Sequence, residues 1–191
     1  MRRIDTEIPG VCLLEPRPFG DERGFFFESY HAGRFAELGI TGAFVQDNHS
    51  RSRKGTLRGM HYQLRSPQAK LCRVARGEVL DVVVDIRRGS PAFGRWFSRV
   101  LSEENRLQVY IPAGLAHGFL VLSESADFLY KCDSYYDPED QHRIAWDDPA
   151  LAIPWPLEGA PILSDMDRQA PPLAAVPPEL LPVYDPPAAG A

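Results

Sequence analysis

The chain has 191 residues, of which 44% are hydrophobic and 25% are charged, and these values are typical of one globular domain with a core of its own. The formal net charge is −5 at pH 7. An acidic chain is poorly suited to binding nucleic acid or an anionic membrane surface, so we expect neither kind of partner. A local basic patch for a phosphorylated small molecule remains compatible with this charge.

The N-terminus and the cysteines indicate where the protein acts. Two arginines follow Met1, but no apolar run follows them, so the N-terminus does not predict a signal peptide. No stretch approaches the roughly 18 apolar residues that a membrane span needs. The three cysteines, at positions 12, 72 and 132, are an odd and scattered set, which argues against a disulfide framework or a structural zinc site. We therefore expect a cytoplasmic protein.

Two residue types are unevenly used. Proline occurs 18 times, and 11 of these prolines lie from Pro149 onward, whereas proline usually makes up about 5% of residues. This distribution predicts a folded body followed by a proline-rich C-terminal segment. Lysine occurs only at positions 54, 70 and 131, against 18 arginines, so each lysine is a candidate functional residue.

The predicted elements are mostly short strands. Residues 1–30 are expected to be extended segments joined by Gly and Pro turns, and residues 31–38 a short helix that ends at Gly39. From about residue 43 to residue 136 the pattern indicates strands at roughly ten-residue spacing, which is typical of a sandwich or a small barrel. The clearest strand candidates are residues 79–86, 95–101, 107–111, 118–122 and 127–134.

Beyond residue 137 the periodicity fades, and we expect irregular chain with one short helix wrapped on the body. The fold class predicted from the whole chain is therefore mostly β: a jelly-roll or cupin-like β-sandwich barrel with few short helices and an irregular C-terminal segment.

Residues 55–63 (GTLRGMHYQ) hold the first candidate site. On a regular strand Arg58 and His61 would point to opposite faces, unless Gly59 bulges the chain. Two ionisable groups beside this glycine favour a polar lumen. A surface turn followed by a hydrogen-bonded core histidine is an equally weighted alternative.

Other polar residues of the strand region allow two interpretations each. Lys70 opens an apolar strand, where it either lies inside the barrel or protects an exposed edge. Tyr130 alternates with apolar residues and is either a core tyrosine or a proton donor. Asp165 and Asp167 flank Met166 in a cap or loop, and a catalytic carboxylate there would need a histidine partner.

His117 follows a glycine turn in residues 112–119 (PAGLAHGF), where many cupin-like barrels place a metal ligand. Metal-dependent cupins usually add an HxH pair and a carboxylate from an earlier strand. Here that strand offers only His61-Tyr-Gln63. A metal site is therefore undersupplied with ligands, and we expect none.

Taken together and in order, nine motifs resemble one family, the dTDP-4-dehydrorhamnose 3,5-epimerases of deoxysugar biosynthesis, from about Ile8 to Pro171. The motifs are residues 23–28 (RGFFFE), 45–50 (VQDNHS), 55–63 (GTLRGMHYQ), 68–70 (QAK), 77–79 (GEV), 112–119 (PAGLAHGF), 130–132 (YKC), 146–149 (WDDP) and 163–167 (LSDMD).

This resemblance implies an isomerase on a jelly-roll fold that needs no cofactor and acts on a dTDP-linked 4-keto-6-deoxyhexose. C3 and C5 of such a sugar both flank the C4 ketone, so a base can remove either proton and leave an enolate. Inversion then needs an acid on the opposite face and positive charge near the C4 oxygen. By motif matching His61 is the base, Asp167 its carboxylate partner, Lys70 the cation at the enolate oxygen and Tyr130 the proton donor.

The same matching assigns the remaining candidate positions to substrate binding. Arg23 and Arg58 would bind the pyrophosphate, because arginine pairs well with phosphate oxygens. The other expected substrate contacts come from aromatic, acidic, amide and imidazole side chains: Phe26, Glu28, Gln46, Asn48, Gln63, His117 and Tyr136. In this family the segment with the RGFFFE motif crosses to the partner subunit, so the resemblance implies a homodimer with shared active sites.

Two positions depart from the family pattern. Met166 stands where the family typically has a basic residue, and Gln141 where it often has an acidic ligand contact. Residues 1–170 are expected to form the epimerase-like domain and residues 171–191 a proline-rich tail. Three alternatives stay open: a monoepimerase of the same substrate class, a metal-dependent cupin oxygenase, and a non-catalytic barrel that binds sugar nucleotides.

Overall fold

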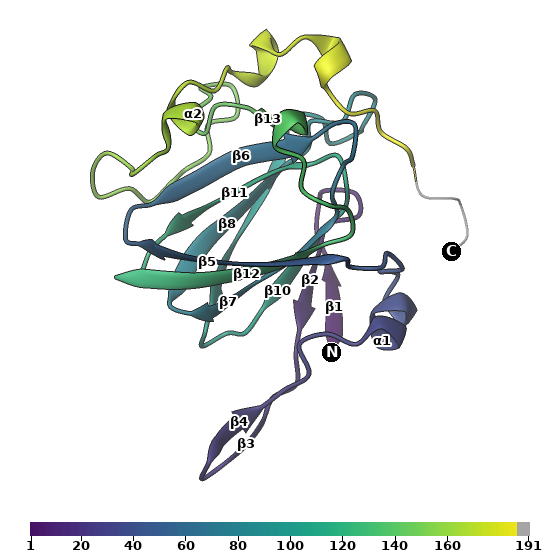
Figure 1. The fold of residues 1–191 in the computed structure, drawn as a ribbon, viewed down its shortest axis with the longest axis vertical. Helices are drawn as coiled ribbons and strands as arrows, with labels where there is room; N and C mark the ends of the chain where they lie inside the picture. The colour runs from purple at the N-terminus through teal and green to yellow at the C-terminus, as the bar shows by residue number, and fades with distance from the viewer. Residues whose placement is uncertain (187–191) are drawn as a thin grey trace.

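Two antiparallel sheets face each other in the computed structural model, which describes residues 1–186 (Figure 1). The six-stranded sheet has the order β1 (Arg2–Asp5), β2 (Cys12–Glu15), β10 (Gln108–Ile111), β7 (Lys70–Arg76), β12 (Ser125–Cys132) and β5 (Gln46–Arg53). The five-stranded sheet has the order β13 (Gln141–Arg143), β6 (Leu57–Gln63), β11 (Ala116–Val121), β8 (Glu78–Val84) and β9 (Trp96–Ser102). The predicted fold class is confirmed.

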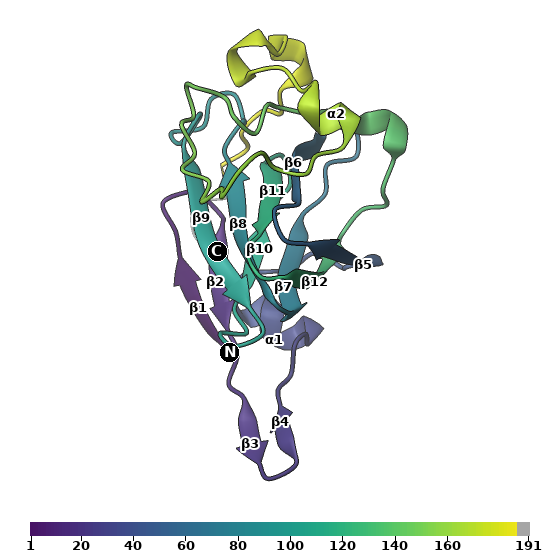
Figure 2. The ribbon, with the colours of Figure 1, turned by 90° about the vertical axis from the view of Figure 1, so that its left-hand side faces the viewer.

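Few elements lie outside these sheets. The hairpin of β3 (Phe19–Asp21) and β4 (Gly24–Phe26) projects away from both sheets, as Figures 1 and 2 show. The helices are α1 (Ala32–Glu37), α2 (Asp165–Arg168) and three short 3-10 turns, Pro138–Asp140, Leu173–Ala175 and Pro178–Leu180. The first helix confirms the one expected at residues 31–38. No helix in residues 1–186 has the length and apolarity to cross a membrane.

Alternation along the strands decides which side chains enter the space between the sheets. On β8, Val79 and Val83 face this inner core, whereas Val82 and Val84 belong to a second apolar cluster on the outer face. A strand that is buried on both faces carries a nearly continuous apolar run, which explains the valines of residues 82–84. The outer cluster is completed by the C-terminal segment.

Residues 171–183 pack onto the outer face of the five-stranded sheet. Leu173, Val176 and Leu181 are buried there. The Tyr62 hydroxyl donates to the carbonyl of Leu180 at 3.1 Å. The packing of the chain therefore does not change at residue 170, where the sequence predicted the end of the domain, and residues 187–191 of the predicted tail lie outside the described residues.

One glycine pair places two polar side chains on the same face of β6. His61 pairs with His117 on β11, and Arg58 pairs with Phe119, so β6 has one residue more than its partner between these pairs. Gly59 has φ +140°, and a Cβ there would lie 2.5 Å from the Cα of Gly118. The strand therefore has a bulge at Gly59, which the sequence allowed but did not decide. As a result, Arg58 and His61 line the same cavity.

Candidate active site

A cavity of about 450 Å³ opens between the two sheets. On β5, Gln46, Asn48 and Ser50 alternate toward it, and on β12 Phe128 and Tyr130 do the same. Inward positions that are apolar elsewhere in the barrel are polar here. The other lining residues are Arg58, His61, Tyr62, Gln63, Gln68, Lys70, His117, Gly118, Phe119, Tyr136, Gln141, Arg143, Ser164 and Asp167.

His61 and Asp167 form a close pair on one wall of the cavity. Nε2 of His61 lies 2.6 Å from Oδ1 of Asp167, although the two residues are 106 positions apart in the sequence. The Ser164 hydroxyl accepts a hydrogen bond from the backbone N–H of Asp167 at 3.1 Å, which caps α2 and fixes the start of this helix. No hydrogen bond within residues 1–186 engages Nδ1 of His61, so Nδ1 is the ring nitrogen left to accept a proton.

The environment keeps Asp167 ionised. Burial alone would raise the pKa of its carboxyl group, but the hydrogen bond and charge of His61, the Ser164 cap and the positive charge of Arg143 together hold this pKa below its usual value. An ionised carboxylate accepts the Nε2 proton and orients the imidazole. This is the arrangement of a histidine base with an orienting partner.

A second histidine–aspartate pair lies deeper between the sheets. Nε2 of His117 is 2.8 Å from Oδ2 of Asp81, and both residues are buried. His117 lines the cavity, as its predicted substrate contact requires. The sequence reasoning did not select Asp81, although a lone carboxylate within the apolar run of β8 is a readable signal for a buried polar partner.

Lys70 and Tyr130 come from two neighbouring strands and both line the cavity. Burial lowers the pKa of Lys70, an effect that Cys132, Cys72 and Asp133 partly oppose. Within residues 1–186 the ammonium group makes no ion pair. It is therefore available to an anionic oxygen of a ligand.

The Tyr130 hydroxyl group is protonated near neutral pH. Burial raises the pKa of its hydroxyl group to about 12. The ring lies beside Phe128, with 6.0 Å between the centroids. Packing of this kind limits the positions of the ring and holds the hydroxyl at the cavity.

The predicted amide and arginine contacts form a polar rim. Arg58 donates from Nε to the Ser52 hydroxyl at 3.1 Å. Gln46 donates to Oδ1 of Asn48 at 3.0 Å, and its own Oε1 accepts from the backbone N–H of Tyr136 at 2.8 Å. The structure therefore brings the four sequence-predicted residues Gln46, Asn48, Arg58 and Tyr136 to the same cavity.

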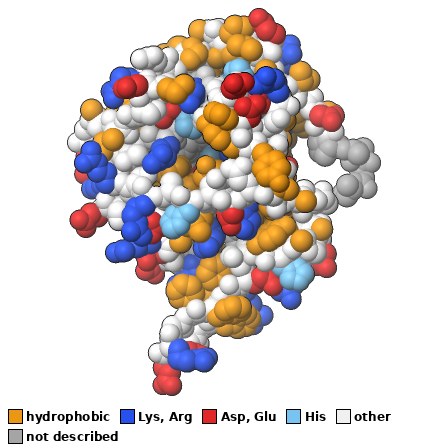
Figure 3. All heavy atoms as spheres, viewed as in Figure 1, with side chains coloured by type: hydrophobic (Ala, Val, Ile, Leu, Met, Phe, Trp, Pro, Cys, Tyr) orange, Lys and Arg blue, Asp and Glu red, His pale blue; other side chains and the backbone are white. Residues whose placement is uncertain are grey.

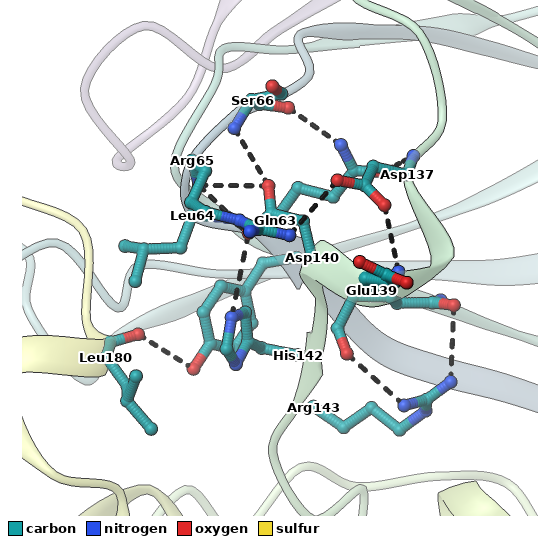
Figure 4. A network of polar contacts seen from close by, with 12 residues as sticks. Gln63, Leu64, Arg65, Ser66, Asp137, Glu139, Asp140, His142, Arg143 and Leu180 are labelled. Carbon is teal, nitrogen blue, oxygen red and sulfur yellow. Dashed lines mark hydrogen bonds and ion pairs between the residues drawn. The ribbon is translucent and has the colours of Figure 1, made fainter.

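Gln63 also lines the cavity, but its amide group is used within the protein. Its Nε2 donates to the carbonyl of Ser66 at 2.8 Å, and its Oε1 accepts from the backbone N–H of Asp137 at 3.1 Å (Figure 4). Beside it, Asp140 accepts three backbone N–H groups, from Leu64, Arg65 and Ser66. This network fixes the chain that leads into β13.

β13 was expected to be irregular chain and is instead the edge strand beside β6. It contributes two cavity residues, Gln141 and Arg143. Oε1 of Gln141 accepts from the Tyr136 hydroxyl at 2.6 Å and from Nη2 of Arg143 at 3.2 Å. Gln141 was among the positions predicted from the sequence to bear on ligand binding, and Arg143 was not. Met166 is 61% exposed and borders a hollow on the other side of β13.

Three predicted substrate contacts lie away from this cavity in the single chain. Arg23 and Phe26 are exposed on the β3–β4 hairpin, where Arg23 pairs with Asp21. Glu28 pairs with Arg34 of α1 at 2.8 Å. Figure 3 shows hydrophobic side chains gathered on the hairpin, which is the part of the chain expected to cross to a partner subunit.

Fold and cavity together define a cupin-like barrel whose cavity gathers a histidine–aspartate pair, a lysine and a tyrosine. Within residues 1–186 no three His, Cys, Asp or Glu side chains are grouped as a metal site requires. Residues 5–175 match the sequence model of the family described as dTDP-4-dehydrorhamnose 3,5-epimerase. The chain belongs to this epimerase family.

Relatives and solved structures agree with this assignment. A dTDP-4-dehydrorhamnose 3,5-epimerase of Pseudomonas aeruginosa is 58% identical over 170 residues, which cover 88% of this chain and 94% of that protein. The Legionella pneumophila epimerase in complex with dTDP-4-keto-L-rhamnose has a TM-score of 0.94 at 54% identity, covering 96% of this chain and 98% of that one. ChmJ, a 3'-monoepimerase of Streptomyces bikiniensis in complex with dTDP-quinovose, has a TM-score of 0.87 at 39% identity, covering 94% of this chain and 92% of that one.

Proposed function

We propose that this protein epimerises dTDP-4-dehydro-6-deoxy-D-glucose at C3 and C5 and gives dTDP-4-dehydro-β-L-rhamnose. The observation that carries the proposal is that His61, paired with Asp167, lines the same cavity as Lys70 and Tyr130. A base, a cation and a proton donor are the three groups that inversion next to a ketone requires.

The reaction follows from the chemistry of these groups. His61 takes the proton from C3 or C5, and the electron pair of the broken C–H bond moves into the carbonyl to form an enolate. The ammonium group of Lys70 stabilises the negative charge on the C4 oxygen. Tyr130 then gives a proton to the opposite face of the same carbon. The ketone itself acidifies both C–H bonds, so the proposed reaction needs no redox or metal cofactor.

The rim of the cavity suits the nucleotide part of the substrate. Arg58 would bind the pyrophosphate together with Arg23 of a second subunit, and Tyr136 would pack on the base or sugar. Gln46 and Asn48 offer amide contacts on the same rim. These roles are supported by the placement of the rim residues and by the solved relatives, whose ligands are dTDP-sugars.

A homodimer explains the hairpin. Phe19, Phe25 and Phe26 are 60%, 59% and 71% exposed on β3 and β4, and large exposed apolar patches usually mark an interaction surface. We propose that the hairpin crosses to a second subunit and brings Arg23, Phe26 and Glu28 to its cavity. We also propose that the enzyme acts in the cytoplasm, in keeping with three free, buried cysteines.

Solvent exchange tests the function directly. The protein is incubated with dTDP-4-keto-6-deoxyglucose in deuterated water, and the sugar is followed by ¹H NMR. We expect deuterium at both C3 and C5. Deuterium at one carbon only would favour a monoepimerase, the activity named for the ChmJ relative. Absence of exchange at both carbons would overturn the proposal in favour of a non-catalytic sugar-nucleotide-binding protein.

A further inference from the structure

Arg143 reaches the catalytic wall from the edge strand. It lies directly opposite His61 in the β13–β6 ladder. Its Nε is 3.4 Å from Oδ1 of Asp167, the same oxygen that lies 2.6 Å from Nε2 of His61. The Arg143 side chain is only 15% exposed. One carboxylate oxygen is thus shared between the base and a largely buried cation.

The guanidinium group is held in place from its other side. Nη2 donates to Oε1 of Gln141 at 3.2 Å, and Nη1 donates to the backbone carbonyl of the same residue at 3.4 Å. Nε has no hydrogen-bond partner within the described residues. Buried N–H groups are normally paired, but this N–H, with Nε 3.4 Å from Oδ1 of Asp167, is not aligned for a hydrogen bond to it, so the contact between the two side chains is an ion pair.

Gln141, which binds the guanidinium group of Arg143 on the rim side, is neutral and therefore leaves the positive charge of Arg143 in place. Gln141 accepts from both Arg143 and the Tyr136 hydroxyl, but an amide does not neutralise a cation. The charged and titratable side chains that face Asp167 within residues 1–186 are His61 from β6 and Arg143 from β13. The positive charge of Arg143 therefore acts mainly on Asp167.

We propose that Arg143 is a positioning residue, which keeps Asp167 ionised and aligned with His61 and links this pair through Gln141 to Tyr136 on the rim. This inference rests on the proposed function of the site. An ionised Asp167 keeps the proton on Nε2 of His61 and leaves Nδ1 free to act as the base. Met166, at the position where a basic residue was expected, is exposed outside the cavity, so the cation is delivered to Asp167 from β13.

Arg143→Gln is the decisive variant, and Arg168→Gln is its matched control. Arg168 is an exposed arginine on the same helix as Asp167. We expect Arg143→Gln to lower kcat about tenfold with KM changed less than about threefold, and to move the acid limb of the pH–kcat profile upward by roughly one unit. Arg143→Lys keeps the charge and should restore the acid limb. Arg168→Gln should match the wild-type enzyme.

A titration without substrate separates this inference from the proposed function. The ¹³C signal of the Asp167 carboxyl group is followed against pH in the free wild-type, Arg143→Gln and Arg143→Lys proteins. A higher pKa of Asp167 in Arg143→Gln supports the inference even if the wild-type protein proves inactive on the dTDP-sugar. An unchanged Asp167 titration overturns it.

Folding of the variants is monitored by thermal unfolding. If Arg143→Gln does not fold, Arg143→Met, which also removes the charge, takes its place: an acid limb moved upward relative to that of Arg143→Lys supports the inference, and equal acid limbs overturn it. Equal losses of kcat in Arg143→Gln and Arg168→Gln would also overturn it.

Discussion

His61 and His117 are direct partners across the β6–β11 ladder, and each is held at Nε2 by its own aspartate. The aspartate of His61 comes from α2, a helix that the long C-terminal segment delivers, whereas that of His117 comes from the neighbouring strand β8. His61 is the more accessible of the two, with 28% of its side chain exposed against 9% for His117. Both histidines line the cavity, and the greater accessibility of His61 suits it better to the proposed role of the base.

His61→Ala removes the proposed base, so we expect deuterium exchange at C3 and C5 to fall by at least about 10³-fold, measured by ¹H NMR in deuterated water. His142→Gln is the control. His142 lies on β13, the strand that pairs with the strand of His61, and its ring stacks on Tyr62 and borders the hollow outside the cavity. Normal exchange in His61→Ala would refute the base assignment.

Tyr130→Phe separates proton removal from proton return. Loss of the hydroxyl leaves His61 in place, so the first proton should still exchange, while reprotonation on the opposite face should slow by about 10²-fold or more. The measurement is the ratio of deuterium incorporation to epimerised product in the same NMR sample. Full epimerisation by Tyr130→Phe would exclude Tyr130 as the donor.

Lys70 should tolerate no replacement, including arginine. A planar guanidinium group does not fill the place of a compact ammonium group that is directed at a developing oxyanion. We expect both Lys70→Arg and Lys70→Met to lose about 10²-fold or more in kcat. Lys131→Arg, at a half-buried lysine outside the cavity that pairs with Asp47, should keep wild-type kcat. Wild-type turnover in Lys70→Arg would contradict the proposed contact with the C4 oxygen.

Replacement of Lys70 by an apolar residue should stabilise the fold, although it lowers kcat. Burial lowers the pKa of Lys70, so charging this group near neutral pH opposes folding. Lys70→Met should therefore raise Tm by roughly 2–4 °C at pH 7. A lower Tm would show that the ammonium group has a stabilising partner.

Much of the fold follows from local patterns in the sequence, but the pairing of His61 with Asp167 does not. Short apolar runs and turn residues predicted β8, β9, β10, β11 and β12 to within three residues at each end. β13 escaped prediction because its three residues, QHR, carry no apolar alternation and its partner strand is distant in sequence. His61 and Asp167 are separated by 106 positions, so only the family resemblance indicated their pairing.

Asp140 is predicted to be a pH-dependent stabilising residue. Burial would raise the pKa of its carboxyl group, but backbone N–H groups of Arg65, Ser66 and Leu64 hold this pKa below its usual value. A lowered folded-state pKa stabilises the protein above the unfolded-state pKa of about 3.9, and this stability is lost as pH falls through the folded-state pKa.

Asp140→Asn should therefore cost about 2–3 kcal/mol of unfolding free energy at pH 7 and less near pH 3. Urea unfolding at both pH values measures this difference. Glu139→Gln changes an exposed neighbouring carboxylate and should leave the unfolding free energy nearly unchanged. An equal cost of Asp140→Asn at both pH values would show that ionisation of Asp140 does not contribute.

The C-terminal segment is predicted to be part of the folded domain. Leu173, Val176 and Leu181 fill the outer apolar cluster of the five-stranded sheet, and the backbone N–H of Leu173 donates to Oδ2 of Asp148 at 2.7 Å. Burying three such side chains contributes about 4–8 kcal/mol, which is comparable to the whole stability of many domains. A chain ending at residue 170 should lose more than about 10 °C in Tm or fail to fold. A chain ending at residue 186 keeps every one of these contacts and should unfold at the wild-type Tm. If the chain of 170 residues unfolded at the wild-type temperature, the segment would be a dispensable tail.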